Sequence, residues 1–307
     1  MINGLFQSSA TRVFIAALLG LLSALGVQAQ GEDDVVKVDS SIVVMNATIR
    51  DAQNRSVNGL KQGEFKVFED GVQQKISSFE SQESPFSAVI LLDTSGSMEE
   101  RISIARSAAI NFLNGLRVDD YAAIYRFDSQ TVMVQDFSDS RDITDKIFDL
   151  KAKGQTVLND AVVKAVTELD KRSEKRKAVI VISDGADTFS KASADKALKS
   201  ALAANVTIYT VDMSSLETNM VQRRQSQGVL KSFAEKTGGV FISTENVRAL
   251  RDALKAIVDE LQIQYTIAYE PTNLKRDGKW HALEVRVARP NLTIRTREGY
   301  NAPKEKR

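Results

Sequence analysis

Hydrophobic and polar residues alternate in three different ways along this chain. Over residues 30–83, short runs of β-branched and aromatic residues stand between polar turns, which is typical of strands. Over 84–262, continuous apolar runs alternate with segments whose apolar residues recur at every third or fourth position, so strands and helices are expected to alternate. Over 263–307 the helical period stops and strand patterns return. The pattern therefore predicts an α/β region between two β segments.

The central region carries the clearest patterns. Residues 87–92 and 178–182 are continuous apolar runs, as expected for strands that are covered on both faces of a sheet. Strands that alternate with helices form a mostly parallel, doubly wound sheet with helices on both faces. Further strands are predicted over 121–127, 131–134, 206–211 and 240–242, and helices over 102–116, 141–151, 158–169, 193–204, 227–237 and 246–262.

Turn-forming and polar residues mark two other connections. The run Glu69-Asp70-Gly71 predicts a hairpin turn between a strand over 65–68 and a second strand over 72–79. The polar stretch between Ser214 and Gly228 predicts an insertion or a mobile loop near the C-terminal rim of the sheet. Loops at that rim usually carry the function of such folds.

The two β segments are short. After residue 262, strands are predicted over 265–269, 282–288 and 292–297. Neither 30–83 nor 263–307 is long enough to bury a core of its own. The economical interpretation is one small β domain made from both segments, with the α/β domain inserted between them.

The first residues of the chain have the composition of an export signal. Residues 13–26 form an uncharged, mostly apolar run behind Arg12, and the small residues around Ala29 suit a signal peptidase. A spanning helix needs roughly 20 apolar residues, which this run does not reach. Residues 1–29 are therefore predicted to be a cleaved signal peptide, with a retained anchor as the alternative. No second run is apolar enough to span a membrane after cleavage.

Composition excludes several classes of function. The chain has 41 Lys+Arg and 40 Asp+Glu, no Cys and one His. Near-neutral charge offers no basic field for nucleic acid. The lack of Cys excludes disulfides, zinc–thiolate sites and thiol catalysis. Loss of residues 1–29 removes one Arg and no acid, so the net charge falls from +1 to 0.

Oxygen-bearing side chains follow the two most apolar strands and precede one helix. They stand in the segments Asp93-Thr94-Ser95-Gly96-Ser97, Gly154-Gln155-Thr156 and Ser183-Asp184-Gly185. The carboxyl ends of parallel strands meet at one edge of a sheet, where ligands bind in such folds. Carboxylates and hydroxyls suit Mg²⁺, Mn²⁺ or Ca²⁺ and do not suit zinc or copper. Alternation along an extended first loop would place its donors on one side.

These segments resemble the von Willebrand factor A-type domain, also called the integrin I-like domain. Asp93-Thr-Ser-Gly-Ser97 matches its DxSxS signature, Thr156 stands at its second-loop threonine and Asp184 at its third-loop aspartate. Gln155 stands where many relatives have Gly. The wider layout resembles a group of exported bacterial proteins, which the flanks Lys66-Val-Phe-Glu-Asp-Gly71 and Arg297-Glu-Gly-Tyr300 also match.

The resemblance implies a Rossmann-like fold with a metal-ion-dependent adhesion site. It implies Mg²⁺, Mn²⁺ or Ca²⁺ as the ion, and a partner protein whose Asp or Glu completes the coordination. The chain would then be an exported, periplasmic or secreted bacterial interaction module and not an enzyme. Loops 183–190 and 213–227 would frame the contact. The metal-binding residues that the resemblance implies are Asp93, Ser95, Ser97, Thr156 and Asp184.

Two other functions stay open at this point. One is a metal-dependent hydrolase that uses the same rim, and the other is a structural assembly subunit whose ion site is vestigial. A serine nucleophile would need a G-x-S-x-G elbow and a partner histidine, but the sequence reads T-S-G-S and His281 belongs to the C-terminal β segment. A phosphotransfer aspartate commonly needs a second carboxylate two residues on, and Ser95 occupies that position.

Overall fold

The structure is a computed structural model that describes residues 42–81, 84–139, 145–215, 218–244 and 246–304. By its internal contacts, Ser41–Arg307 forms one compact unit, distinct from Met1–Ser40. The predicted signal peptide, residues 1–29, lies outside the described residues. Among the residues that are described, no helix is both long and apolar enough to cross a membrane.

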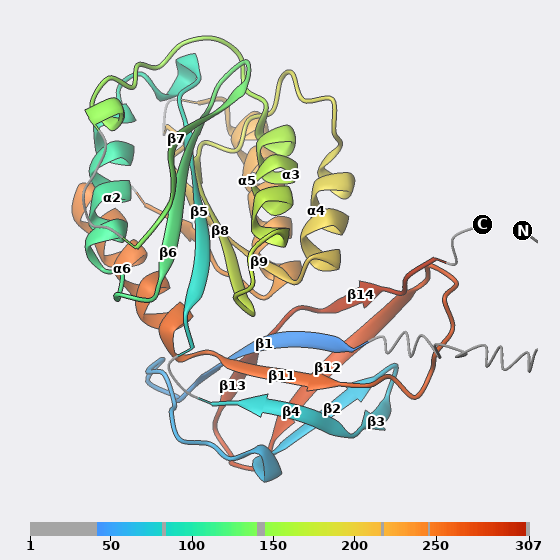
Figure 1. The fold of residues 1–307 in the computed structure, drawn as a ribbon. Coiled ribbons are helices and arrows are strands. Elements are labelled where there is room, and N and C mark those ends of the chain that lie inside the picture. The colour runs from blue at the N-terminus through green and yellow to red at the C-terminus, as the bar shows by residue number, and fades with distance from the viewer. Residues whose placement is uncertain (1–41, 82–83, 140–144, 216–217, 245, 305–307) are drawn as a thin grey trace, which may run out of the picture. The chain divides into compact units, whose positions relative to one another are not determined.

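A six-stranded sheet forms the centre of the α/β region (Figure 1). Its strand order is β10-β9-β8-β5-β6-β7, and every neighbouring pair is parallel except β6 with β7. This is the mostly parallel, doubly wound sheet that the alternation of patterns predicted. The strands are β5 (Phe86–Asp93), β6 (Tyr121–Phe127), β7 (Thr131–Ser138), β8 (Arg176–Ser183), β9 (Val206–Asp212) and β10 (Phe241–Ser243).

Helices cover both faces of this sheet because each has one apolar side. The helices α2 (Ile102–Asn114) and α6 (Val247–Ile263) pack on one face. The helices α3 (Leu158–Asp170), α4 (Ala194–Ala203) and α5 (Met220–Thr237) pack on the other. Figure 1 shows the two layers on either side of the sheet. The inner strands β5, β8 and β9 are buried along almost their whole length, which explains their continuous apolar runs.

The N- and C-terminal β segments pair with each other in two antiparallel sheets. One sheet has the order β13-β1-β11-β4 and the other β14-β12-β2-β3. Side chains from both enclose a third core, which includes Met45, Val67 and Ile267. The strands are β1 (Val43–Arg50), β2 (Phe65–Glu69), β3 (Val72–Gln74), β4 (Ile76–Glu80), β11 (Tyr265–Tyr269), β12 (Trp280–Val287), β13 (Thr293–Arg295) and β14 (Gly299–Asn301).

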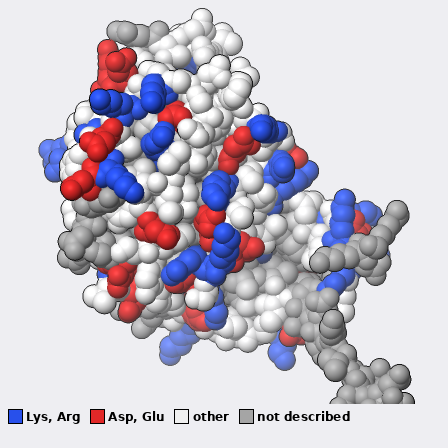
Figure 2. Space-filling view, turned by 45° about the horizontal axis from the view of Figure 1, so that its top comes forward, with Lys and Arg blue, Asp and Glu red and all other residues white. Residues whose placement is uncertain are grey.

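Charged side chains of both signs are interspersed over the face turned to the viewer in Figure 2. This agrees with the formal net charge of +1 for the whole sequence. On that face, recognition of a charged partner has to depend on local groups, because no broad field of one sign is present.

The structure differs from the predicted elements at two places in the first half of the chain. The strand predicted over 72–79 is interrupted at Lys75, and its halves, β3 and β4, belong to different sheets. The helix predicted over 141–151 is wrong where the chain is described. There the segment holds a single 3₁₀ turn, η3 (Asp145–Ile147), with residues 141–144 outside the described ranges.

The polar stretch 214–228 is also not one loop. Helix α5 begins at Met220, and the Asn219 side chain caps it by accepting a hydrogen bond from the Val221 N–H at 2.9 Å. The hydrophobic pattern missed this part of the helix because its first turns are exposed and carry no apolar stripe. The cap residue was the available signal.

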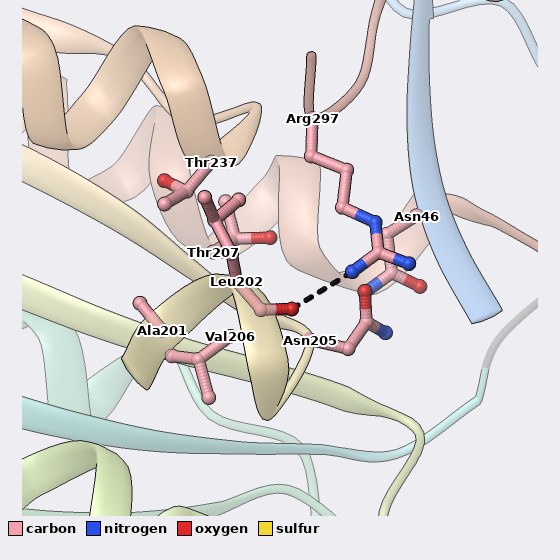
Figure 3. Close-up of a pocket in the computed structure, with 8 residues that line it drawn as sticks. All are labelled: Asn46, Ala201, Leu202, Asn205, Val206, Thr207, Thr237 and Arg297. Carbon is pink, nitrogen blue, oxygen red and sulfur yellow. Dashed lines mark hydrogen bonds between the residues drawn. The ribbon is translucent and has the colours of Figure 1, made fainter. Parts of the chain in front are cut away.

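Buried arginines join the β sheets to the α/β region. Arg176, fully buried in β8, donates to the carbonyl oxygen of Gln262 at 3.1 Å, at the end of α6, and to the hydroxyl of Thr266 in β11 at 3.4 Å. Arg297 donates to the carbonyls of Leu202 and Val44 at 2.9 and 2.7 Å. Figure 3 shows Arg297 reaching the end of α4. Burial lowers the pKa of each guanidinium to about 10, which leaves both charged at neutral pH.

Candidate metal and ligand site

Asp93 is the last residue of β5 and is fully buried. Its Oδ1 accepts hydrogen bonds from the backbone N–H of Ser95 at 2.9 Å and from the Ser95 hydroxyl at 2.5 Å. Its Oδ2 accepts a hydrogen bond from the Ser183 hydroxyl at 2.5 Å. Ser183 ends the neighbouring strand β8, so the shared end of two parallel strands brings these groups together. The carboxylate is therefore held in one orientation at the rim.

The environment of Asp93 makes its negative charge costly without a cation. Burial, together with the nearby charge of Asp184, raises the pKa of Asp93 to about 7. The hydrogen bonds from Ser183 and Ser95 act in the opposite direction. A positive ion beside the carboxylate would favour its ionised form.

The first loop turns toward solvent after Ser95. It is not extended as expected, because Gly96–Met98 forms the 3₁₀ turn η2. The hydroxyl oxygens of Ser95 and Ser97 nevertheless lie 3.1 Å apart. Ser95 is buried and Ser97 is exposed. The two hydroxyls thus lead from the buried carboxylate to the solvent.

Backbone hydrogen bonds join the second loop to the first. The Gly96 N–H donates to the Gly154 carbonyl at 3.2 Å, and the Lys153 N–H donates to the Thr94 carbonyl at 2.8 Å. Gly154 has φ +82°, and a Cβ there would come within 2.6 Å of the Ser129 hydroxyl oxygen. A side chain at 154 would therefore be strained by the backbone conformation and would force Ser129 to move.

The third loop is joined to the second through Thr156. The Thr156 N–H donates to the Thr188 hydroxyl at 3.0 Å, and the backbone N–H groups of Thr188 and Phe189 both donate to the Thr156 carbonyl at 3.0 Å. Asp184 is partly buried, and its Oδ1 accepts from the Ala186 N–H at 3.0 Å. Thr156 and Asp184 thus belong to a connected rim that also holds Asp93.

Asp187, three residues after Asp184, joins the third loop to the start of α3. Its Oδ2 accepts a hydrogen bond from the Asn159 N–H at 2.8 Å, in the first turn of α3. Its Oδ1 accepts from the Ser190 N–H at 3.0 Å. An acceptor at the start of a helix satisfies a donor that has no partner within the helix. Asp187 therefore fixes the third loop against α3.

The structure links the candidate residues in two ways. Asp93, Ser95 and Ser97 are joined by direct hydrogen bonds, whereas Thr156 and Asp184 are brought to the same rim by the loops that carry them. Sequence reasoning did not select Ser183 as part of the site. The register of β5 and β8 pairs Leu92 with Ile182, which places Ser183 beside Asp93.

The donors present fit a hard divalent cation. Two carboxylates and three hydroxyls offer oxygen only, which is the ligand set that Mg²⁺, Mn²⁺ and Ca²⁺ prefer. The buried Asp93 carboxylate, with its pKa raised to about 7, gives such an ion an electrostatic reason to bind. The role of these residues as metal ligands stays a prediction.

Sequence comparison matches a known family model to the segment that contains the three loops. Residues 88–186 match the model of the von Willebrand factor type A domain. The match extends from β5 to the third loop and so contains all five candidate residues. No curated protein matches the chain.

Several solved structures resemble the chain at low identity. A von Willebrand factor type A protein from Catenulispora acidiphila is 13% identical with a TM-score of 0.49, and the match covers 88% of this chain and 76% of that one. A D319A mutant of the PilB minor pilin from Streptococcus sanguinis is 13% identical with a TM-score of 0.47. That match covers 58% of this chain and only 62% of the pilin. An aerotolerance-related membrane protein from Bacteroides fragilis is 19% identical with a TM-score of 0.45, over 57% and 98% of the two chains.

Proposed function

We propose that the rim binds a divalent cation, Mg²⁺ or else Mn²⁺ or Ca²⁺, and through it an acidic side chain of a partner protein. The observation that carries this proposal is the connected arrangement of Asp93, Ser95 and Ser97, in which a buried carboxylate is clamped and two hydroxyls lead from it to solvent. The bound ion would supply a local positive charge and an open coordination position.

The chain's own residues explain why an acidic partner is favoured. Asp93 and Asp184 would supply two negative charges, and Ser95, Ser97 and Thr156 would add neutral hydroxyls. The two carboxylates would neutralise the charge of a divalent ion without exceeding it. The ion could therefore still accept electron density from a further carboxylate supplied by the partner. The Ser183 hydroxyl, which donates to Asp93 Oδ2, would keep this carboxylate oriented toward the ion.

Apolar side chains near the rim would add to the contact. Phe189 belongs to the third loop, is 60% exposed, and is tied by its N–H to the Thr156 carbonyl. Met220 and Val221, at the start of α5, are 67% and 76% exposed. Exposed apolar groups beside a polar centre are typical of protein interfaces. Loops 183–190 and 213–227, the latter partly helical, would set specificity.

The proposed role is that of an exported interaction module without catalysis. In support, His281 is placed in β12 of the β sheets, where its Nδ1 lies 2.7 Å from Asp70 Oδ2. No imidazole is therefore available to act as a base for Ser95 or Ser97. Export, to the periplasm or out of the cell, follows from the proposed signal at residues 1–29.

Mg²⁺ titration of wild type and Asp184→Asn, followed by thermal unfolding, tests the proposal. An ion bound only by the folded state raises the melting temperature of wild type. Asp184→Asn, which keeps size and an acceptor oxygen, should lose most of that shift. Asp195→Asn, on the exposed side of α4, is the matched control and should respond like wild type. Equal shifts of the melting temperature in all three proteins would refute the metal site.

Partner binding needs a second measurement. The immobilised chain should retain an envelope protein in Mg²⁺ and release it on addition of a chelator. The retained partner should lose binding when its contacting Asp or Glu is changed to the amide. If the amount of retained protein changes neither with the chelator nor with Asp184→Asn, metal-mediated binding of the partner is refuted.

A further inference from the structure

A second group of metal-binding donors lies in the β sheets, apart from the rim. Glu69 ends β2, Asp70 is in the turn that follows, and His281 is near the start of β12. The antiparallel register pairs Glu69 with Leu283 and so brings His281 to the same end of the sheet. One ligand atom from each of the three residues lies within 4.8 Å of the others. Residues about two hundred positions apart thus form one cluster.

One distance within the cluster is close to the spacing of two ligands of one ion. His281 Nδ1 lies 3.4 Å from Glu69 Oε1 and 2.7 Å from Asp70 Oδ2. Bonds of about 2.0–2.1 Å in a tetrahedral zinc site separate neighbouring ligand atoms by about 3.3 Å. The longer distance matches that separation. The shorter one is a hydrogen bond, so a bound ion would displace the shared proton, and His281 Nδ1 and Asp70 Oδ2 would move apart to about the same 3.3 Å.

The two carboxylate oxygens of Glu69 have different partners. Its Oε2 accepts hydrogen bonds from the hydroxyls of Tyr269 at 2.5 Å and Tyr300 at 3.1 Å. Burial, with the charge of Glu69, raises the pKa of both phenols, which remain neutral donors. Among the described residues, Oε1 contacts no donor except His281 Nδ1 at 3.4 Å. Glu69 as a residue is 2% exposed, and the 3.4 Å contact places its Oε1 on the side that faces His281.

We propose that Glu69, Asp70 and His281 bind a divalent transition metal of the Zn²⁺ class. One imidazole nitrogen and two carboxylate oxygens suit Zn²⁺ and its neighbours better than Mg²⁺. Asp70 is exposed and gives the ion a route of entry, whereas the other two ligands are buried. A bound ion would tie the turn after β2 to β12 and so fasten the N-terminal β segment to the C-terminal one.

This site is independent of the rim. The rim offers oxygen only, and the β-sheet cluster offers the one imidazole of the chain. The two proposals can be tested separately, because Mg²⁺ is the ion expected at the rim and Zn²⁺ the ion expected at the β-sheet cluster. If one proposal fails, the other is unaffected.

Calorimetric titration of Zn²⁺ into the chelator-treated full chain, with Mg²⁺ in excess, tests the proposal. Wild type should bind one equivalent and gain thermal stability. His281→Gln should abolish binding, and Asp70→Asn should weaken it at least tenfold. Asp184→Asn, at the rim, should bind Zn²⁺ like wild type. Co²⁺ in place of Zn²⁺ should give visible absorption bands in wild type that the two cluster variants lose.

Asp70→Asn decides the result even where His281→Gln does not fold. Asp70 has φ +49°, a conformation that Asn tolerates well, and its Oδ1 accepts from the Ala282 N–H at 2.9 Å, a role that an amide oxygen can keep. Absence of binding by wild type would overturn the proposal. So would equal Zn²⁺ affinity in wild type and Asp70→Asn, which would indicate adventitious binding.

Discussion

At the scale of single residues, Asp93 links the fold to the proposed chemistry. Two hydroxyls and a backbone N–H hold its carboxylate, and burial raises its pKa to about 7. An ordinary aspartate would be ionised at neutral pH with no cation nearby. At a pKa of about 7, a proton would compete with the proposed cation for the Asp93 carboxylate.

This competition predicts a pH dependence. The folded pKa of Asp93, about 7, exceeds its usual value of 3.8, so between those values the folded chain holds a proton that the unfolded chain has lost. The metal-free protein should therefore lose stability as pH rises from 4 to 7. The Mg²⁺-induced rise in melting temperature should be larger at pH 8 than at pH 5.5. The same rise at both values would show that Asp93 does not ionise on binding.

Ser183→Ala is a second prediction at this scale. It removes one donor from a buried carboxylate, which should cost about 1–3 kcal/mol of unfolding free energy and raise the pKa of Asp93 further. Mg²⁺ affinity at pH 7 should fall with it. Urea unfolding and Mg²⁺ titration measure the two effects. Ser190→Ala, on the third loop but away from Asp93, is a control that should leave the pH dependence of Mg²⁺ binding unchanged.

At the scale of elements, the rim is built from loops that brace each other. The Gly96 N–H donates a hydrogen bond to the Gly154 carbonyl, and the Thr156 N–H donates one to the Thr188 hydroxyl. The Ser183 hydroxyl donates a hydrogen bond to the Asp93 carboxylate. Each loop follows a strand or precedes a helix whose position is set by the core. The geometry of the candidate ligands therefore depends on the backbone of their neighbours as well as on their own side chains.

Gly154→Ala tests this dependence. The substitution places a Cβ within 2.6 Å of the Ser129 hydroxyl oxygen at a residue with φ +82°. We expect a loss of about 1–3 kcal/mol in unfolding free energy and weaker Mg²⁺ binding, because the second loop must shift. Gly63→Ala is the matched control, since its Cβ would meet nothing within 4 Å. Equal stability and Mg²⁺ affinity in both variants would show that the loop adapts without cost.

At the scale of the whole molecule, Glu260 in α6 connects the α/β region to the β sheets. Its Oε2 accepts from Arg50 of β1 at 2.8 Å, and its Oε1 accepts from Tyr209 of β9 at 2.7 Å and from Arg295 of β13. Glu260 is 2% exposed, and the two arginines keep its pKa below the usual range against the effect of burial. Loss of this charge would leave two arginines without their partner.

Glu260→Gln should therefore destabilise the chain by about 3–5 kcal/mol in urea unfolding. A lowered carboxyl pKa contributes stability above the unfolded value, and this is lost as the pH falls through the folded value. The difference between wild type and variant should thus shrink in acid. Glu284→Gln, at an exposed pair with Arg286, should change stability by less than about 1 kcal/mol. A Glu260→Gln variant as stable as this control would exclude a joining role.

Local patterns in the sequence were enough for the type of most elements and for the place of the rim. Continuous apolar runs predicted β5 and β8, because a strand that is buried on both faces needs apolar residues at every position. A period near 3.6 predicted α3 and α6, because a helix that buries one stripe needs apolar residues only at every third or fourth position. Asp93, Thr156 and Asp184 were selected because they stand beside strand and helix ends.

Tertiary structure alone decided what those residues touch. The Ser183 hydroxyl on Asp93 depends on strand register, and the break between β3 and β4 depends on which sheet each half can join. His281 meets Glu69 and Asp70 because β12 pairs with β2. A local pattern records whether a residue is buried and in which kind of element. It does not record which distant residue lies opposite, since that is settled by packing of the whole chain.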